Sequence, residues 1–399
     1  MNGIQADARV ACYGKTGLCF THGSGARLFT ESGQSYLDFL SGIGVNSLGH
    51  AHPGLTKTIQ EQAERFLHVS NLYDHPWQAR FAARLAEACG LDQVFFSNSG
   101  AEAIEAGLKM ARRFQFDQGD QPRTAFLALE GSFHGRTLGA LSCTSNPDYR
   151  RPFAPLIHEV DFLPRDDIER LEGALRSRRY AALLIEPIQG ESGVLPLPVL
   201  FLKEARRITQ ETGTLLLFDE IQCGGGRTGS FLHSAKAGVQ PDIVTLAKPI
   251  AAGLPVGATV VTREVGQHLV PGDHGSTFGG GPLVCAAGLF FLEELLDRGL
   301  MLRVQEAGAR FAEGLDRLSA GIDRVDHRRG EGLMQALVLE TPSAPVNARL
   351  QEHGLLANAC GGTALRFLPP YIVSDDDIDE ALRILEDVLT AEDQPPLPE

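Results

Sequence analysis

Six short apolar runs, separated by glycine-bearing loops and helical patterns, constrain the fold of this chain more than any other feature. They span residues 94–97, 124–129, 181–186, 214–219, 243–247 and 257–262. Strands that alternate with helices are typical of a mostly parallel α/β sheet with right-handed crossovers. The sequence therefore predicts a large α/β domain, and 399 residues are enough for a second domain as well.

Outside these runs the pattern changes. Residues 18–42 show short alternating runs with Gly turns, which predict a small antiparallel sheet or hairpins. Helical patterns at 53–69 and 282–297 flank the six runs. From residue 300 onward, helices and strands are mixed as in an α+β layer. The predicted helices there are 302–319, 346–353 and 375–391, and the predicted strands lie near 324–329, 333–340, 355–358 and 364–367.

These patterns divide the chain into three predicted parts. We expect residues 1–50 to form an N-terminal segment that packs with the small domain. Residues 51–299 are expected to form the large α/β domain, and residues 300–399 the small α+β domain.

Two of the six runs lead into charged residues. Asp219 ends one run, and Lys248 directly follows another. Functional groups in parallel sheets lie just past the carboxyl ends of the strands, so this carboxylate and this amine are expected at the same sheet edge. Such a pair suits pyridoxal phosphate, because the Lys bonds to the cofactor and the Asp keeps its ring nitrogen protonated. For these two residues alone, a plain buried ion pair is the alternative.

The segment Asn98–Ala103 predicts a phosphate site. Ser99 is a favourable N-cap, and Gly100 allows the backbone to approach a ligand closely. The free N–H groups at the start of the following helix favour an anion. Considered alone, an ordinary Ser-capped helix explains the segment equally well.

The run Gly224–Gly229 formally fits the G-x-G-x-x-G pattern of dinucleotide sites. Such a site also needs a helix that opens at the last Gly and an acidic residue at the end of the next strand. Here Asp242 precedes that strand and Lys248 ends it. A nicotinamide oxidoreductase is therefore the disfavoured alternative, and a non-catalytic phosphate-binding protein is another.

The segment Gly131–Thr137 carries two candidate binding residues. Phe133 is able to stack on a flat cofactor ring, and Arg136 is able to bind a carboxylate through a bidentate fork. Taken alone, a packed Phe and an exposed Arg are the simpler interpretation.

Composition limits the partners and the compartment. The net charge of −14 disfavours nucleic acid and anionic membranes as partners. The seven scattered Cys, without a C-x-x-C pair, are typical of free thiols in a reducing cytoplasm, and Met1–Gly14 contains no apolar leader segment.

His50 and His52 lack an obvious third ligand, so we predict no metal. Cys223 is either a reactive thiol or, more simply, a small packing residue.

Six motifs in order closely resemble the class III pyridoxal-phosphate aminotransferases, and the resemblance extends over residues 10–390. It implies the type I aminotransferase fold, whose large domain matches the predicted α/β region. The motifs are Asn98–Ala103, Phe133–Thr137, Glu186–Glu191, Asp219–Gln222, Leu246–Lys248 and Gly275–Gly280.

The resemblance implies roles for individual residues around the cofactor. Lys248 would bond to it and move a proton during the reaction, and Asp219 would pair with its ring nitrogen. Gln222 would hydrogen-bond on the side of its ring hydroxyl, and Phe133 would stack on the ring. The complete set implied for cofactor binding is Ser99, Gly100, Ala101, Phe133, Asp219, Gln222, Lys248 and Thr277.

The resemblance also implies a homodimer with shared active sites. Ser276 and Thr277 match a stretch that reaches the neighbouring subunit's cofactor, with Thr277 at its phosphate and Ser276 on the substrate side. Arg366 matches the residue that binds the substrate carboxylate, and Glu191 matches an acidic gate that pairs with Arg366 while the amine donor is bound. A movable acid is physically sensible, because an unpaired buried guanidinium is costly.

The implied reaction is transamination of the terminal amine of N-acetylornithine with 2-oxoglutarate, in arginine biosynthesis. Arg136 is the residue expected to bind the donor carboxylate remote from the reacting amine. Alternatives for the donor are ornithine, succinylornithine or succinyldiaminopimelate, 4-aminobutyrate and a carrier-linked intermediate of a lysine pathway. Departures from the family pattern at Ile104, Pro249 and Gly281 leave these alternatives open.

Overall fold

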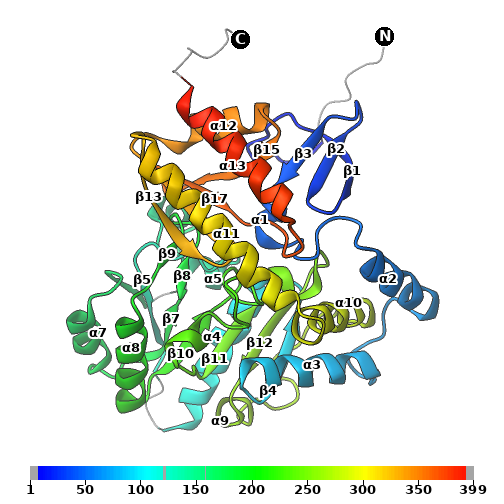
Figure 1. The fold of residues 1–399 in the computed structure, drawn as a ribbon. Coiled ribbons are helices and arrows are strands. Elements are labelled where there is room, and N and C mark those ends of the chain that lie inside the picture. The colour runs from blue at the N-terminus through cyan, green and yellow to red at the C-terminus, as the bar shows by residue number, and fades with distance from the viewer. Residues whose placement is uncertain (1–7, 120–122, 158, 392–399) are drawn as a thin grey trace.

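Seven strands form the large sheet of the computed structural model, which describes residues 8–119, 123–157 and 159–391 (Figure 1). Most neighbouring strands are parallel, and β12 is antiparallel to both of its neighbours. The prediction of a mostly parallel sheet is therefore confirmed. The strand order is β4 (Gln93–Ser97), β12 (Gly257–Val261), β11 (Ile243–Leu246), β10 (Leu215–Asp219), β7 (Tyr180–Ile185), β5 (Ala125–Leu129) and β6 (Val160–Leu163).

The strand missing from the sequence prediction is β6. It lies at the edge of the sheet, next to β5, and all four of its residues are only partly buried. Its sequence Val-Asp-Phe-Leu includes a charged residue, Asp161. An edge strand with partial burial does not produce the continuous apolar run that marks the central strands.

Alternate residues of the strands build a separate core on each face of the sheet. Leu216 and Phe218 of β10 belong to the core that also contains Phe81 and Phe201. Leu215 and Leu217 belong to the other core. The first face is covered by α3 (Pro76–Cys89), α7 (Ile168–Leu175), α8 (Val199–Thr212) and α10 (Pro282–Leu292), and the second by α4 (Gly100–Asp117) and α5 (Leu138–Ser142).

The second lobe combines the C-terminal segment with the N-terminal strands. One of its sheets has the order β13 (Val325–Glu331), β14 (Met334–Leu339), β17 (Ala364–Phe367), β16 (Asn358–Cys360). The other has the order β1 (Phe20–Ser24), β2 (Arg27–Thr30), β3 (Ser35–Asp38), β15 (Leu355–Leu356). The parallel pairing of β3 with β15 joins the two ends of the chain.

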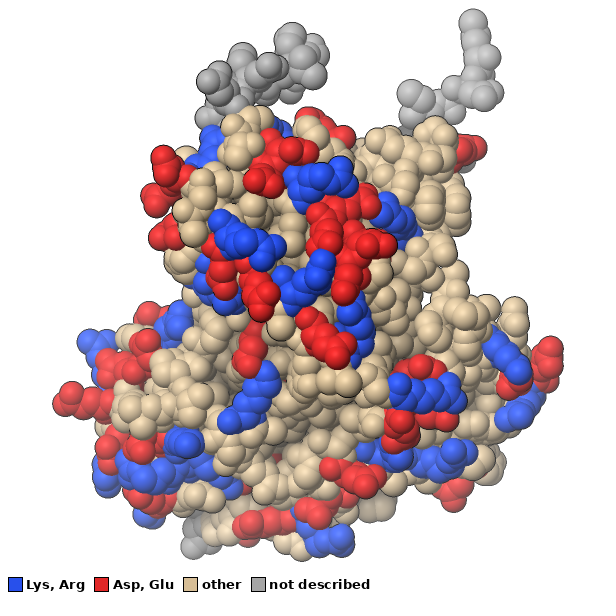
Figure 2. All heavy atoms as spheres, viewed as in Figure 1, with Lys and Arg blue, Asp and Glu red and all other residues tan. Residues whose placement is uncertain are grey.

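Three helices pack in this lobe: α11 (Leu300–Gly321), α12 (Ser343–Glu352) and α13 (Asp375–Thr390). Acidic and basic side chains are interspersed over the face of the lobe shown in Figure 2. Ion pairs join α11 to α13, with Arg310 Nη2 2.6 Å from Asp379 Oδ2 and Arg303 Nη2 2.7 Å from Asp375 Oδ1. No helix among the described residues is long and apolar enough to cross a membrane.

The remaining elements are short or peripheral. Helix α2 (Pro53–Arg65) ends before the predicted residue 69, because Phe66 adopts an extended backbone. Phe66 and Leu67 consequently lie outside the helix and are 38% and 60% exposed, so the predicted extension of this helix to residue 69 is wrong. The other short elements are α1 (Ser41–Gly44), α6 (Pro147–Arg150), α9 (Arg263–Gly266), β8 (Ile188–Gln189) and β9 (Leu195–Pro196).

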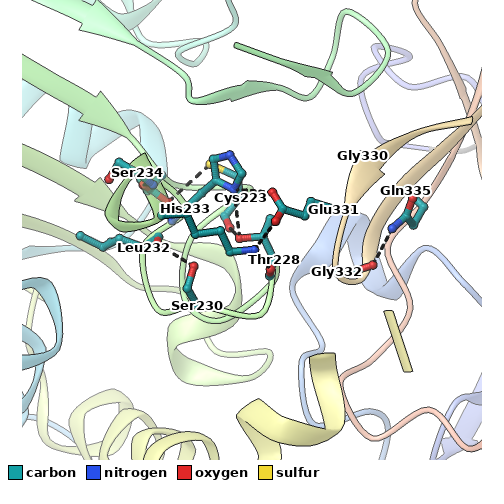
Figure 3. Close-up of polar contacts among 12 residues, drawn as sticks. Cys223, Thr228, Ser230, Leu232, His233, Ser234, Gly330, Glu331, Gly332 and Gln335 are labelled. Carbon is teal, nitrogen blue, oxygen red and sulfur yellow. Dashed lines mark hydrogen bonds and ion pairs between the residues drawn. The ribbon is translucent and has the colours of Figure 1, made fainter. Parts of the chain in front are cut away.

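The run Gly224–Gly229 forms a buried turn at the boundary between the lobes and opens no helix, so the dinucleotide alternative lacks an element that it requires. The segment after it faces the turn between β13 and β14, where His233 Nδ1 lies 3.4 Å from Glu331 Oε2 (Figure 3). Arg227 is fully buried, and its Nη1 donates to the Leu333 carbonyl at 3.2 Å. These glycines therefore serve close packing between the lobes.

Candidate active site

A cavity of about 510 Å³ opens at the carboxyl ends of β10 and β11. It brings together most of the site residues predicted from the sequence, although they come from widely separated segments. The predicted residues that line it are Ser99, Gly100, Ala101, Phe133, Arg136, Glu191, Asp219, Gln222 and Lys248. Arg366, Ser276 and Thr277 do not line it.

Asp219 ends β10 and is fixed by two hydrogen bonds. Its Oδ1 accepts from the backbone N–H of Ile221 at 3.1 Å, and its Oδ2 lies 2.8 Å from His134 Nδ1. Burial alone lowers the pKa of His134, but the hydrogen bond and charge of Asp219, with the charge of Glu186, leave that pKa raised. This arrangement holds a carboxylate rigidly at the cavity wall. No pattern in the sequence assigned a role to His134.

Glu186 is a second buried acid in the same wall. Its Oε2 accepts from the backbone N–H of Phe133 at 2.9 Å. Burial raises the pKa of Glu186 to about 7, and the nearby charge of Asp219 raises it too, whereas His134 opposes the shift. The cavity therefore contains two acids in different environments, one fixed beside His134 and one favoured in its protonated form.

Lys248 lies two residues beyond the end of β11, in a left-handed backbone conformation with φ of 38°. Such a conformation is strained for a residue with a side chain, and strain of this kind concentrates at functional sites. Within the described chain, its amine makes no hydrogen bond or ion pair. Burial lowers the pKa of Lys248, and the charge of Arg366 lowers it further, against the opposing effect of Glu191 and Asp219. A lowered pKa favours the neutral, nucleophilic amine.

The start of α4 forms one end of the cavity. Ser99 caps the helix, since its side chain accepts from the backbone N–H of Glu102 at 3.2 Å. The other N–H groups of the first turn have no carbonyl acceptor within the helix and carry its partial positive charge. A Cβ on Gly100 would lie 2.9 Å from Ile221 Cδ1, so a larger residue here would have to displace the Ile221 side chain. The turn is therefore suited to a phosphate.

Arg136 lies on the exposed side of the cavity. Its guanidinium carbon is 3.8 Å from the ring centroid of Tyr149 and 5.5 Å from that of Phe133. Among the described residues it has no carboxylate partner and no hydrogen bond. Stacking on an aromatic face orients the guanidinium while its in-plane N–H groups stay available for an anion.

Arg366 on β17 is the other cationic group close to the cavity. It is fully buried behind Glu191 and Gln222, and its Nη1 lies 2.6 Å from Glu191 Oε1 and 3.1 Å from Gln222 Oε1. Although burial raises the pKa of Glu191, the charge and hydrogen bond of Arg366 hold that pKa below its usual value. The predicted juxtaposition of Glu191 and Arg366 is present in the structure.

Ser276 and Thr277 lie elsewhere within this chain. They line a different cavity, together with Asn98, Glu102 and His274. Ser276 Oγ accepts from Asn98 Nδ2 at 3.2 Å, whereas Thr277 is exposed. Neither residue lines the cavity that contains Lys248.

The remaining candidates have structural surroundings. Ile104 is fully buried in the core of the α4 face, and neither it, Pro249 nor Gly281 lines the Lys248 cavity. His50 Nε2 lies 2.8 Å from Asp38 Oδ2. Burial, aided by Glu220, raises the pKa of the Cys223 thiol well above its usual value, which favours the packing role over a reactive one.

Comparisons with known proteins agree with this geometry. The family model described as aminotransferase class-III matches residues 11–389. The chain is 43% identical over 380 residues to the acetylornithine aminotransferase of Mesorhizobium japonicum, which covers 95% of each chain. The chain is a class III aminotransferase.

Solved structures place it in the same group. An ornithine aminotransferase from Toxoplasma gondii superposes with a TM-score of 0.91 at 32% identity, covering 95% of this chain and 92% of that one. A PLP-bound amine transaminase from an uncultivated Pseudomonas species superposes with a TM-score of 0.87 at 28% identity, covering 93% of this chain and 94% of that one. This aminotransferase therefore has the type I fold and depends on pyridoxal phosphate, with an amino donor and a keto acid as substrates.

Proposed function

We propose that this enzyme transfers the terminal amine of N-acetylornithine to 2-oxoglutarate, giving N-acetylglutamate 5-semialdehyde and glutamate, in arginine biosynthesis. The observation that carries the proposal is the placement of two arginines around Lys248. Arg136 lines the cavity and has no carboxylate partner among the described residues, whereas Arg366 lies behind the cavity wall, paired with Glu191. The similarity to the acetylornithine aminotransferase of Mesorhizobium japonicum supports the choice of donor.

The residues of the cavity suit pyridoxal phosphate. When bound, the cofactor supplies a protonated ring that withdraws electrons from the carbon carrying the amino group. Asp219, held by His134, is positioned to keep the proton on the ring nitrogen. Phe133 would stack on the ring, Gln222 would hydrogen-bond beside its hydroxyl, and the first turn of α4 from Ser99 to Ala101 would hold the phosphate.

Lys248 supplies the covalent attachment point and the mobile proton. Its lowered pKa favours the neutral amine, which would accept the proton from the substrate carbon and release it again on the cofactor side of the linking nitrogen. No other lysine lines the cavity formed by the described residues. The role of Lys248 is therefore not shared.

Glu191 and Arg366 solve the problem of two unlike substrates in one site. The donor presents a terminal amine without an adjacent carboxylate, and Glu191 then neutralises Arg366. The acceptor 2-oxoglutarate carries a carboxylate next to its reacting carbon, and this carboxylate replaces Glu191 on Arg366. Arg136 binds the carboxylate of the donor that is remote from the reacting amine.

Ornithine is an alternative donor, because the Toxoplasma gondii structure that superposes on this chain with a TM-score of 0.91 is an ornithine aminotransferase. The two donors differ in the group beside the remote carboxylate, which is an acylamino group in one and a free ammonium in the other. Rates with each donor distinguish these functions.

The active unit in this proposal is a homodimer that works in the cytoplasm. Apolar side chains gather beside the Ser276–Phe278 segment, where Phe278 is 64% and Leu72 is 86% exposed. Asn71 Nδ2 donates to the Ser276 carbonyl at 2.9 Å and fixes this segment. An exposed apolar surface of this kind favours a protein interface, and it would deliver Thr277 to the partner's phosphate site. Sedimentation of the wild type would reveal a monomer if this is wrong.

The substitution Lys248→Ala tests the proposed function. The variant should lose the yellow absorbance of the covalently attached cofactor, because it lacks the attachment point. Its rate of transamination of N-acetylornithine should fall by many orders of magnitude, because it also lacks the group that moves the proton. Lys203→Ala, at an exposed position on α8, is the matched control and should behave as wild type. Near-normal turnover of Lys248→Ala would refute the assignment of the site.

A further inference from the structure

Three oxygen atoms of different charge hold the guanidinium of Arg366. Nη1 donates to the carboxylate of Glu191 at 2.6 Å and to the amide oxygen of Gln222 at 3.1 Å. Nη2 donates to the amide oxygen of Asn358 at 2.5 Å. One of the partners is therefore an anion and the other two are neutral amides.

The three partners also differ in how firmly they are positioned. Asn358 lies on β16 directly opposite Arg366 on β17, as a paired residue of the antiparallel ladder. Gln222 is buried. Glu191 lies outside any strand, in the turn between β8 and β9, and its side chain is 38% exposed against 1% for Arg366. Glu191 is thus the partner free to move, and Asn358 is the one fixed by the sheet.

This division has an electrostatic consequence. A neutral amide oxygen satisfies an N–H group of the guanidinium without cancelling its charge. When Glu191 moves away, Arg366 therefore keeps both its place and its full positive charge. A carboxylate at position 358 would instead pair with Arg366 permanently, in competition with any incoming carboxylate.

We propose that Asn358 is a positioning residue for the acceptor half-reaction. It holds Nη2 of Arg366 while Glu191 leaves, and its neutral amide keeps the guanidinium charge available to the carboxylate next to the reacting carbon of the acceptor. The inference rests on the proposed function, because it assumes that Arg366 binds the acceptor and that the donor does not use it.

Asn358→Asp tests the inference with a minimal change, the replacement of the side-chain NH2 group by a charged oxygen. We expect the dissociation constant of the holoenzyme for glutarate, an unreactive dicarboxylate, to rise by about tenfold or more. The KM for 2-oxoglutarate should rise by a similar factor. The single-turnover rate with N-acetylornithine should change by less than about threefold, because Arg366 is already neutralised by Glu191 in that half-reaction. A merely structural role of Asn358 would not separate the two half-reactions.

Ala359→Asp is the matched control, since it adds the same charge at the adjacent strand position, whose side chain points to the opposite face of the sheet. It should leave glutarate binding within about twofold of wild type. Asn358→Ala removes the acceptor without adding charge, and its glutarate affinity should lie between those of wild type and Asn358→Asp.

Three results would overturn the inference. They are wild-type glutarate affinity in Asn358→Asp, equal losses in both half-reactions, and, if Asn358→Asp does not fold, wild-type glutarate affinity in Asn358→Ala. The proposed function fails separately, when the wild type shows no transamination that depends on Lys248. Glutarate binding does not require turnover, so the two failures remain distinguishable.

Discussion

Two acid–base pairs border the same cavity, and they differ in exposure. In the Asp219–His134 pair the atoms are 2.8 Å apart and the side chains are 4% and 0% exposed. In the Glu191–Arg366 pair they are 2.6 Å apart, but the acid is 38% exposed and the arginine 1%. The distances alone would suggest similar roles, and the burial separates them.

The difference in burial follows from the charge that each pair must handle. Removing one partner from a fully buried pair leaves an uncompensated charge, so the Asp219–His134 pair is fixed. The acid of the other pair borders the cavity, where a substrate carboxylate is able to take its place on Arg366. The first pair therefore serves every turnover in the same way, whereas the second distinguishes the two substrates.

The largest effect is expected from Asp219→Asn. An amide cannot stabilise a proton on the ring nitrogen, so both half-reactions should slow by orders of magnitude and by similar factors. The cofactor should remain bound, which its absorbance reports. A variant with the wild-type rate would show that Asp219 does not hold the ring nitrogen and would remove one side of the comparison.

Substitution of Arg136 should affect the donor alone. A charge-assisted bidentate bond is worth roughly 1.5–3 kcal/mol, so Arg136→Ala should lower kcat/KM for N-acetylornithine by about 10- to 150-fold. Arg136→Lys should recover only part, because a point charge cannot reproduce the planar fork.

The matching measurement is kcat/KM for 4-aminobutyrate, which lacks the acylamino group beside the remote carboxylate. A wild type that prefers N-acetylornithine and keeps that preference in both variants would make Arg136 an ordinary surface residue. A wild type without the preference would refute the choice of donor while leaving the family assignment intact.

Glu186→Gln should change the pH dependence of stability. The pKa of Glu186 is raised by burial to about 7 in the folded protein, and an unfolded Glu titrates near pH 4.3. Between these values the folded state binds the extra proton, so the stability that this group contributes at low pH is lost as the pH rises toward 7. Gln has no such loss.

Thermal melts of both proteins at pH 5 and pH 8 check this prediction. The stability of Glu186→Gln relative to wild type should increase from pH 5 to pH 8, by about 1–3 kcal/mol. A difference that does not change with pH would show that Glu186 is not protonated preferentially in the folded state.

Much of the fold and of the site could be predicted from local patterns. The apolar runs placed Asp219 and Lys248 at one sheet edge, because burial on both faces produces uninterrupted apolar strands. Ser99 signalled the start of α4 through its preference for the N-cap position. The edge strand β6 and the early end of α2 were missed, since partial exposure weakens the first signal and Phe66 continued the apolar pattern past the second.

The contacts that position the functional groups could not be predicted in the same way. His134 contacts Asp219, which lies 85 positions later in the sequence. Arg136 stacks on Tyr149, which lies on the short helix α6. Asn358 lies only 8 residues before Arg366, but the pairing depends on the turn that sets the register of β16 and β17. Such contacts result from tertiary packing, and no spacing along the chain announces them.

The most direct test of the contrast between the fixed pair and the gate is Glu191→Ala, followed in single turnovers of each half-reaction. We predict that glutamate reacts at least as fast as with wild type, because Arg366 is then free of Glu191. N-acetylornithine should react more slowly, because an unpaired guanidinium faces its reacting end. Glu313→Ala, at an exposed position on α11, should leave both rates unchanged. Equal slowing of both half-reactions by Glu191→Ala would contradict this prediction, because Glu191 would then be a structural acid and not a gate.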